Sequence, residues 1–396
     1  MSQPSSGAHR VPAADFTALR REFPLLARKT YLNSGSYGVL ANEVKAAFEA
    51  YLEDRSRVGA DWDLWVGKHE AVRSRVGELL GASPEEIAVT ASVSAGLNSL
   101  ASALDFSGPR NKVVISDFEF PTVAQIWHAQ ERRGARIVHV ARAADGYIPA
   151  AAFAAAIDEH TQLVSITHVC FRNGARLDVP GIVEIAHARG ARVLLDCYQS
   201  VGSMSVDVKA LGVDFAVGGM LKYLLGTAGI GFLYVREALV PSLVPTDSGW
   251  FAQENIGAMQ IGANLPAASA RRFEAGTPAV VNCYASEAGL NLLLRIGIEP
   301  VERRVRALTA HCLRRLEQIG WSSVTPPQDE RRGATVAIPS RDATRLVREL
   351  KDRGIVTSSR DDNVRAAFHF YNDESDVQVL CAALEDLRAS LAPWPR

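Results

Sequence analysis

The stretch AVGGMLKYLLGTAGIGFLYV, Ala216 to Val235, places a single lysine, Lys222, between a pair of glycines and a second glycine-rich turn. A lysine in an apolar segment often buries its stem and leaves its ammonium in water, and the alternative is an amine held at a reactive site. The flanking runs, VDFAVGG at residues 213–219 and GIGFLYV at residues 229–235, are continuous and apolar. Such runs are typical of strands covered on both faces.

Similar runs precede this stretch: EIAVT (86–90), KVVIS (112–116), ARIVHV (135–140), LVSITHV (163–169) and ARVLLD (191–196). Helical patterns lie between several of them, such as SAGLNSLASAL and VPGIVEIAHARG, the latter opened by a proline and closed by a glycine. This alternation predicts an α/β fold with a mostly parallel sheet flanked by helices.

The pattern of apolar and polar residues changes after about residue 285 and indicates a second domain. From there on, amphipathic helices alternate with short strand candidates, ATVAIPS and VRAAFHF. We expect an N-terminal arm and helix at residues 1–30, a large domain at residues 31–284 and a smaller α+β domain at residues 285–396. The largely helical segment before the sheet is expected to pack with the small domain.

Composition excludes several classes of protein. The 396 residues include 43 basic and 44 acidic ones, with no block of like charge, so a nucleic-acid partner is not expected. The polar first residues lack the apolar core of a signal peptide, and no run approaches the roughly 20 apolar residues of a membrane span. The five cysteines show no CxxC or Cys/His spacing, which argues against disulfides and a metal site. We expect a cytoplasmic protein whose partner is a small molecule or another copy of itself.

Polar residues at the ends of the predicted strands are candidates for chemistry, because ligands bind beyond the carboxyl ends of parallel strands. Asp196 ends ARVLLD and Gln199 follows one helical turn later, although an acid at a strand end also commonly caps the next turn. The turn ASVSAGLN (91–98) opens a helix whose free amides can hold a phosphate, although Ser94 is also an ordinary N-cap. Phe120 in DFEFPT either lies flat on a planar ring or fills core.

These motifs together resemble a known family. The order and spacing of LNSGSYG, ASVSAGLN, DFEFPT, HVCFRNG, DCYQSVG, GGMLKYLLGTAGIGFLYV, SGWFA and RRFEAGTP are similar to those of the fold-type I, class V aminotransferase family. That family includes cysteine desulfurases, kynureninases and isopenicillin-epimerase-like proteins. The resemblance runs from about Tyr31 to the C-terminus. It implies pyridoxal 5'-phosphate as cofactor, an amino-acid substrate transformed through an external aldimine and a quinonoid, and a homodimer with a shared active site.

The resemblance also assigns roles within the large, cofactor-binding domain. Lys222 matches the lysine that forms the Schiff base and moves protons at the substrate's α-carbon. Asp196 matches the acid that pairs with the pyridine nitrogen, and Gln199 the residue beside the ring's phenolic oxygen. Phe120 stands where desulfurases carry a stacking histidine. The phosphate ligands implied are Val93, Ser94, Trp250 and Thr277, the last from the neighbouring subunit.

The substrate is assigned in the same way. Arg365 in NVRAAFHFYNDESDV resembles the family arginine that binds the α-carboxylate, since a guanidinium donates two parallel hydrogen bonds to one carboxylate. Without the resemblance, Arg365 reads as a surface arginine on a strand. Ser36, Tyr37 and Asn173 are candidates for substrate contact, with ordinary turn chemistry as the alternative.

Departures from the family pattern reduce the number of reactions to be expected. Gly219 and Leu221 stand where desulfurases commonly carry a serine and a histidine, and the segment GIVTSSRDDNVRAAF (354–368) lacks the desulfurase loop cysteine. Val123 replaces the acid that follows FPT in kynureninase. We therefore expect an aminotransferase first, because transamination needs no catalytic group beyond the lysine. A C–S or C–C lyase of desulfurase or kynureninase type is the alternative, followed by an epimerase and a non-catalytic cofactor-binding protein.

Overall fold

The computed structural model describes residues 14–393. Its largest sheet has seven strands in the order β2-β8-β7-β6-β5-β3-β4. All of its neighbours pair in parallel except β8, which is antiparallel to both β2 and β7. The strands are β2 (Ile87–Thr90), β3 (Lys112–Ser116), β4 (Arg136–Val140), β5 (Thr161–Thr167), β6 (Arg192–Asp196), β7 (Phe215–Gly219) and β8 (Gly231–Val235). Each apolar run singled out from the sequence supplies one of them, so the predicted α/β fold is confirmed.

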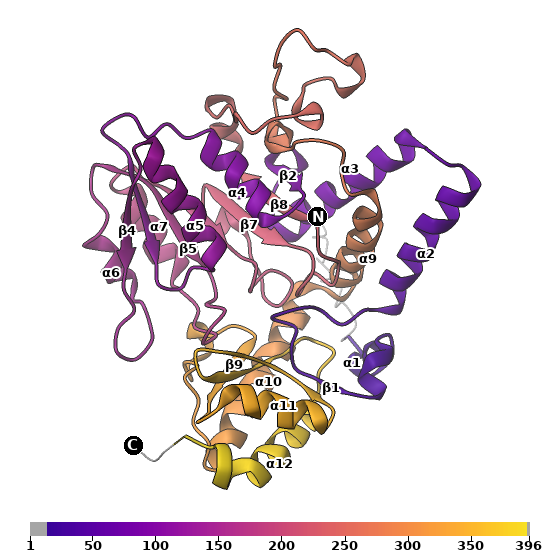
Figure 1. Ribbon diagram of the computed structural model, residues 1–396, viewed down its shortest axis with the longest axis vertical. Coiled ribbons are helices and arrows are strands. Elements are labelled where there is room, and N and C mark those ends of the chain that lie inside the picture. The colour runs from indigo at the N-terminus through magenta and orange to yellow at the C-terminus, as the bar shows by residue number, and fades with distance from the viewer. Residues whose placement is uncertain (1–13, 394–396) are drawn as a thin grey trace, which may run out of the picture.

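Both faces of this sheet are covered, which explains the continuous apolar runs. On β6, Val193 and Leu195 join a core that includes side chains of α7, whereas Leu194 faces the core formed with α4 and α5. The helices that follow strands of the sheet are α4 (Val93–Ser102), α5 (Pro121–Ala129), α6 (Ala150–Ala154), α7 (Val179–His187) and α8 (Val208–Leu211). Figure 1 shows them around the strands in the upper part of the molecule.

The C-terminal part has its own three-stranded sheet and core, at the bottom of Figure 1. Its elements are α10 (Ile298–Gln318), β9 (Thr335–Pro339), α11 (Ala343–Asp352), β10 (Ile355–Val356), β11 (Ser358–Arg360), β12 (Asn363–Ala367) and α12 (Glu374–Leu391). The expected boundary after residue 284 falls inside α9 (Val280–Ile296), whose Leu290 and Leu293 join the core of the large sheet. Val301 of α10 joins that core too, and Leu308 the C-terminal one. We propose that the small domain begins within α10.

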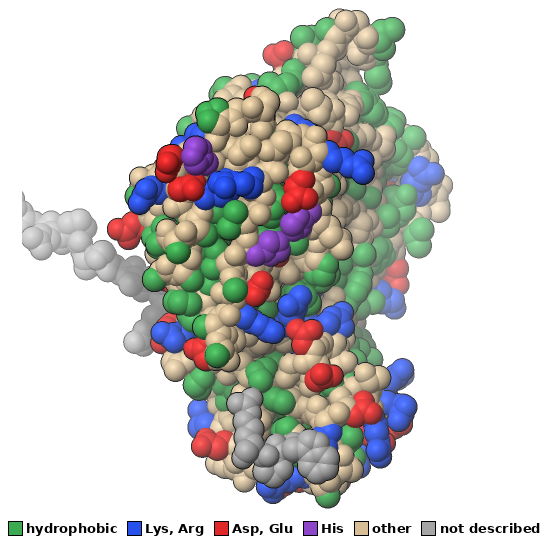
Figure 2. Space-filling view, turned by 60° about the vertical axis from the view of Figure 1, so that its left-hand side comes forward, with side chains coloured by type: hydrophobic (Ala, Val, Ile, Leu, Met, Phe, Trp, Pro, Cys, Tyr) green, Lys and Arg blue, Asp and Glu red, His purple; other side chains and the backbone are tan. Residues whose placement is uncertain are grey.

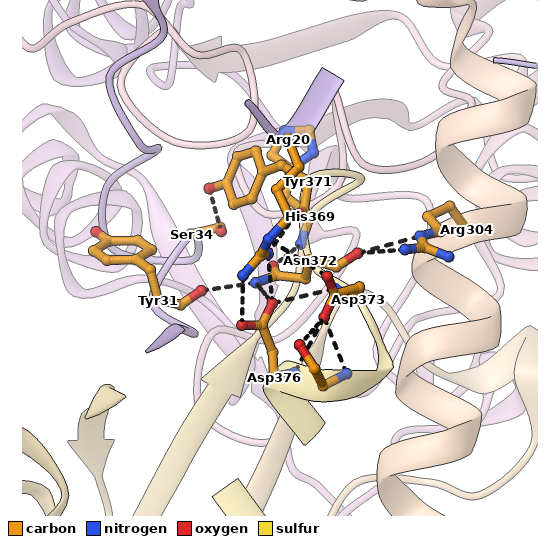
Figure 3. A network of polar contacts seen from close by, with 10 residues as sticks. Arg20, Tyr31, Ser34, Arg304, His369, Tyr371, Asn372, Asp373 and Asp376 are labelled. Carbon is orange, nitrogen blue, oxygen red and sulfur yellow. Dashed lines mark hydrogen bonds and ion pairs between the residues drawn. The ribbon is translucent and has the colours of Figure 1, made fainter. Parts of the chain in front are cut away.

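The N-terminal segment joins the two parts. The helices α2 (Asn42–Arg57) and α3 (Trp62–Leu80) pack on α9, whereas β1 (Thr30–Tyr31) pairs in parallel with β10. Arg20, at the end of α1 (Phe16–Arg20), donates from Nη1 to Asp376 Oδ2 over 2.8 Å, and the Ser34 and Tyr371 hydroxyls lie 2.7 Å apart (Figure 3). These contacts fix the chain that leads into the turn LNSGSYG.

The described surface agrees with the composition. On the face in Figure 2, Lys and Arg side chains lie interspersed with Asp and Glu side chains rather than in a field of one sign. Within residues 14–393, no helix has the length and apolar character that crossing a membrane requires.

Candidate active site

A cavity of about 310 Å³ lies where the carboxyl ends of β5, β6 and β7 meet the start of α4. Ligand sites of open α/β sheets form in this position, because the strand ends leave a crevice there. Thr167 ends β5 and Asp196 ends β6, and both line the cavity. The structure brings together there these residues singled out from the sequence: Lys222, Asp196, Gln199, Phe120, Val93, Ser94 and Ser36.

Lys222 sits on a turn just after β7, and the backbone of that turn is held from two sides. The Gly38 amide donates to the carbonyl of Leu221 over 2.8 Å. His369 Nε2 donates to the carbonyl of Tyr223 over 3.0 Å, and burial lowers the pKa of His369 to about 4, which keeps this imidazole neutral. A Cβ on Gly38 would lie 2.3 Å from the carbonyl oxygen of Lys222, so only glycine allows the turn LNSGSYG to come this close.

The amine of Lys222 lies among aromatic rings. Its Nζ is 4.1 Å from the ring centroid of Tyr198 and 5.7 Å from that of Phe120. Burial, together with the positive charges of Arg365 and Arg360, lowers the pKa of Lys222 to about 8, although Asp196 acts in the opposite direction. A substantial fraction of this amine is therefore neutral near pH 8, as a nucleophilic lysine requires.

Asp196 is a buried acid that lines the same cavity as Lys222. Its Oδ1 accepts from the Tyr198 amide over 2.9 Å. Burial raises the pKa of Asp196, while that amide and the charge of Lys222 oppose the rise. A carboxylate in this environment is stabilised by any cation that reaches it.

Glu119 is a second buried acid that the sequence analysis did not single out. Its carboxyl accepts from the Thr167 amide over 3.0 Å and from the Thr167 hydroxyl over 2.9 Å. Burial, reinforced by the charge of Asp196, raises the pKa of Glu119 to about 8. Glu119 thus fixes Thr167 in the cavity wall. The only signal in the sequence is an acid between two aromatic residues in DFEFPT, which does not show what the acid contacts.

The start of α4 forms one wall of the cavity. Ser92 caps the helix, since its Oγ accepts from the Ala95 amide over 3.0 Å, so Ser94 is not the N-cap. Val93 and Ser94 are therefore the first residues of the helix, and both line the cavity. The first amides of a helix have no intrahelical partner and carry the positive end of the helix dipole, which favours an anion there.

Tyr198 explains the glycine that departs from the family pattern. A Cβ on Gly219 would lie 2.3 Å from the Tyr198 hydroxyl and from two carbons of its ring. Tyr198 therefore occupies the space in which a side chain at position 219 would stand. Both residues are visible in the sequence, but their contact is not.

Arg365 extends from β12 to the edge of the cavity. Its Nη1 donates to the carbonyl of Phe171 over 2.6 Å, and its Nη2 to the hydroxyls of Ser358 over 2.8 Å and Ser36 over 3.2 Å. Burial, together with the charge of Arg360, lowers the pKa of Arg365 to about 10. Within the described residues its buried Nε has no hydrogen-bond partner. One donor of this guanidinium is therefore unpaired within the protein.

Two of the predicted substrate contacts are not among the residues that line the cavity. Tyr37 is exposed, and its hydroxyl lies 3.0 Å from that of Thr227. Asn173 lines a separate cleft, where its amide donates to the carbonyl of Gly146 over 3.0 Å and accepts from the Ala175 amide over 3.0 Å. Its polar atoms therefore serve the turn of HVCFRNG, which is the alternative role considered for it.

Two of the predicted phosphate ligands also lie elsewhere in this chain. Trp250 Nε1 donates to the carbonyl of Ile256 over 2.6 Å, and its ring packs against that of Trp62 with centroids 5.4 Å apart. Thr277 lines a different pocket, near His69 and Phe273. Neither residue lines the cavity that holds Lys222.

Comparisons with known proteins agree with this architecture. The model of the family Aminotransferase class-V matches residues 63–380. An uncharacterized aminotransferase of Bacillus subtilis (strain 168), YcbU, is 34% identical over 91% of this chain and 94% of its own. A kynureninase of Deinococcus radiodurans is 31% identical over 86% of this chain and 85% of its own. The solved structure of a cysteine desulfurase from Thermococcus onnurineus NA1 superposes with a TM-score of 0.85 at 25% identity, covering 96% of this chain and 98% of that one. The chain therefore belongs to the class V aminotransferase family, whose members are enzymes that depend on pyridoxal 5'-phosphate.

Proposed function

We propose that this protein is an aminotransferase that removes the amino group of an amino acid with the help of pyridoxal 5'-phosphate. The observation that carries the proposal is the amine of Lys222, which has a pKa of about 8 and shares one cavity with the buried acid Asp196. An amine that condenses with an aldehyde must be neutral and accessible, and this arrangement provides both conditions.

The residues present fit the ring of the cofactor. One oxygen of Asp196 accepts a hydrogen bond from the Tyr198 amide. Burial destabilises the charged form of this carboxyl group, and a protonated pyridine nitrogen would stabilise it. Phe120 supplies an aromatic face in the wall, and Gln199 a side-chain amide that donates to the carbonyl of Gly35 over 2.9 Å. Asp196 would therefore hold the pyridine nitrogen, with Phe120 on the ring and Gln199 beside its phenolic oxygen.

The phosphate would lie at the start of α4. Val93 and Ser94 offer backbone amides there, and Ser94 adds a hydroxyl. The hydroxyl of Tyr198 fills the space beside Gly219, where a serine commonly stands in desulfurases. We assign Tyr198 as the donor that replaces that serine.

When bound, the cofactor supplies an electron sink that stabilises negative charge at the substrate's α-carbon. The protein's contribution is to orient the substrate and move its proton. Arg365 would hold the α-carboxylate, and the Nζ of Lys222 would take the proton from the α-carbon and return it. Of the side chains that line the described cavity, Lys222 has a pKa close to neutrality, whereas burial raises that of Tyr198 well above its usual range. A single base of this kind is enough for transamination.

The positions of the cysteines make a desulfurase reaction a weaker candidate than transamination. All five cysteines of the sequence are buried: Cys170, Cys197, Cys283, Cys312 and Cys381. None belongs to the β11–β12 hairpin at the edge of the cavity. A thiol that accepts sulfur from a substrate must be exposed and in the thiolate form, and burial raises the pKa of Cys283 to about 12.

We further propose that the enzyme is a cytoplasmic homodimer in which Thr277 completes the phosphate site of the other subunit. Thr277 lies outside the cavity of its own chain, and Trp250 gives its one side-chain donor to the carbonyl of Ile256. The loop that follows Trp250 projects from the body of the molecule (Figure 1), with Ile261 fully exposed at 100% and Met259 at 65%. Exposed apolar side chains on a projecting loop are typical of an interface.

Incubating the purified holoenzyme with single amino acids and a keto-acid acceptor tests the reaction. We expect a keto acid to form from the donor in step with amination of the acceptor. Pyruvate with ammonia, release of sulfide, or loss of optical purity without keto acid would instead identify a lyase or an epimerase and contradict the aminotransferase assignment.

A further inference from the structure

Arg360 is a second cationic side chain on the hairpin that carries Arg365. It is the last residue of β11. In the β11–β12 hairpin, Ser358 pairs with Arg365 and Arg360 pairs with Asn363. Because side chains alternate between the two faces of a strand, Ser358, Arg360 and Arg365 share one face of the hairpin.

That face is directed toward the site of Lys222. Arg365 donates to the hydroxyls of Ser358 and Ser36, and Ser36 lines the cavity. Diagonal neighbours such as Arg360 and Arg365 lie about 7 to 8 Å apart, within reach of long side chains. The charge of Arg360 lowers the pKa of both Arg365 and Lys222, so both groups feel its guanidinium.

Arg360 has no anionic partner among the residues that the structure describes. Its side chain is exposed, and its Nη1 donates to the carbonyl of Ser359 over 2.7 Å. Arg172, across the hairpin tip, is by contrast neutralised by Asp361 at 3.4 Å. Arg360 and Arg365 thus share one face of the hairpin, and neither forms an ion pair with a carboxylate among the residues that the structure describes.

We propose that Arg360 binds a second anionic group of the substrate, so that the enzyme acts on amino acids whose side chain ends in an acidic group. The inference rests on the proposed function, in which Arg365 takes the α-carboxylate. One carboxylate satisfies one guanidinium, and a terminal carboxylate of the side chain would satisfy the second through charge-assisted hydrogen bonds. Arg360 would then determine specificity without touching the reacting atoms.

Titrating the holoenzyme with amino acids, followed through the visible absorption of the cofactor, tests the inference. The probes are L-aspartate, L-glutamate and L-2-aminoadipate, each compared with a neutral analogue: L-asparagine, L-glutamine or L-norleucine. For the native protein we expect at least one acidic member to bind about 10- to 100-fold more tightly than its neutral analogue, at 1.4 kcal/mol per tenfold. Arg360→Gln should abolish that preference, and Arg360→Lys should retain part of it.

Arg348→Gln is the matched control, because Arg348 is an exposed arginine of α11 outside the hairpin. It should leave the preference unchanged. A native enzyme without a preference for acidic members, or an Arg360→Gln variant with the native preference, would overturn the inference. Keto-acid formation in the same samples separates the two proposals. If Arg360→Gln forms keto acid with the native selectivity, only the role of Arg360 is contradicted. If Arg360→Gln loses the selectivity but neither protein forms keto acid, only the aminotransferase assignment is contradicted.

Discussion

Lys222 changes its chemical character through its surroundings. An exposed lysine has a pKa near 10.4, whereas burial and two nearby guanidinium groups bring that of Lys222 to about 8. Asp196 limits the fall, because its negative charge favours the ammonium form. At the scale of the residue, the pKa of this amine is thus lowered by desolvation and by two arginines, to which we assign anion binding in the proposed function.

The pH dependence of cofactor capture by the apoprotein reports this pKa. A protonated lysine cannot attack, so the rate of covalent capture should rise about tenfold per pH unit at low pH and level off near pH 8. Arg365→Gln removes a cation that lowers the pKa of Lys222, so the midpoint should move to higher pH. Stopped-flow absorbance measures both, with Arg348→Gln as control. A midpoint near 10.4 in the native protein would show an ordinary solvated lysine.

Substrate affinity is the second residue-scale expectation. Hydrogen bonds to a charged group contribute about 1.5 to 3 kcal/mol, so Arg365→Gln should raise KM for an amino acid about 10- to 150-fold. The kcat should change less, because the base is still present. Steady-state kinetics with an amino-acid donor give both parameters. An unchanged KM would place the α-carboxylate elsewhere.

Two turns determine where Lys222 lies. The turn after β7 carries the lysine, and the turn LNSGSYG packs on its backbone through the amide of Gly38. At the scale of elements, the site therefore depends on a contact between segments nearly two hundred residues apart. His369 ties the C-terminal part to the same turn through Tyr223.

Gly38→Ala tests that contact. The new methyl group would lie 2.3 Å from the carbonyl oxygen of Lys222, so the turn must shift, and we expect a loss of about 1 to 3 kcal/mol in the free energy of unfolding. Gly108→Ala is the control, since nothing lies within 4 Å of a Cβ there. Urea denaturation of both variants gives the comparison. Equal stabilities would show that the approach of the two turns is not close.

The pair of Tyr198 and Gly219 gives a second prediction at this scale. Gly219→Ser alone should collide with the Tyr198 ring and destabilise the protein, whereas in a Tyr198→Ala background the serine has room. If Tyr198 holds the phosphate, Tyr198→Phe should weaken binding of pyridoxal 5'-phosphate but not of pyridoxal. The double variant Tyr198→Ala, Gly219→Ser should regain part of the lost affinity for pyridoxal 5'-phosphate. Equilibrium dialysis measures these affinities. Equal losses for both ligands would assign Tyr198 a packing role only.

The sequence predicts the large sheet well and the site in part. Strands buried on both faces leave apolar runs that are visible without a structure, and a residue at the end of a parallel strand, such as Asp196, must lie at the edge where ligands bind. Glu119, the Tyr198–Gly219 contact and Arg360 could not be predicted, because their roles arise only when distant segments pack. Asn173 is singled out from the sequence as a substrate contact, but in the structure its side chain hydrogen-bonds to the backbone of the turn that contains it and of a neighbouring turn.

Over the whole molecule, the proposed dimer has a direct test. Lys222→Ala removes the base from one cavity, and Thr277→Ala would impair the phosphate site of the other subunit. When the two inactive variants are mixed and allowed to exchange subunits, one native site per heterodimer should restore up to about half of the activity of a native dimer. No recovery, despite exchange confirmed by native mass spectrometry, would place Thr277 in its own subunit's site, and a Thr277→Ala variant with native activity would place it in no site.

Covalent attachment of the cofactor to Lys222 is the central claim, and borohydride reduction of the holoenzyme followed by peptide mass spectrometry tests it most directly. The account predicts that the reduced cofactor is found on the peptide that contains Lys222 and that Lys222→Ala, folded by circular dichroism, carries none. Label on another lysine, or a labelled Lys222→Ala protein, would contradict it.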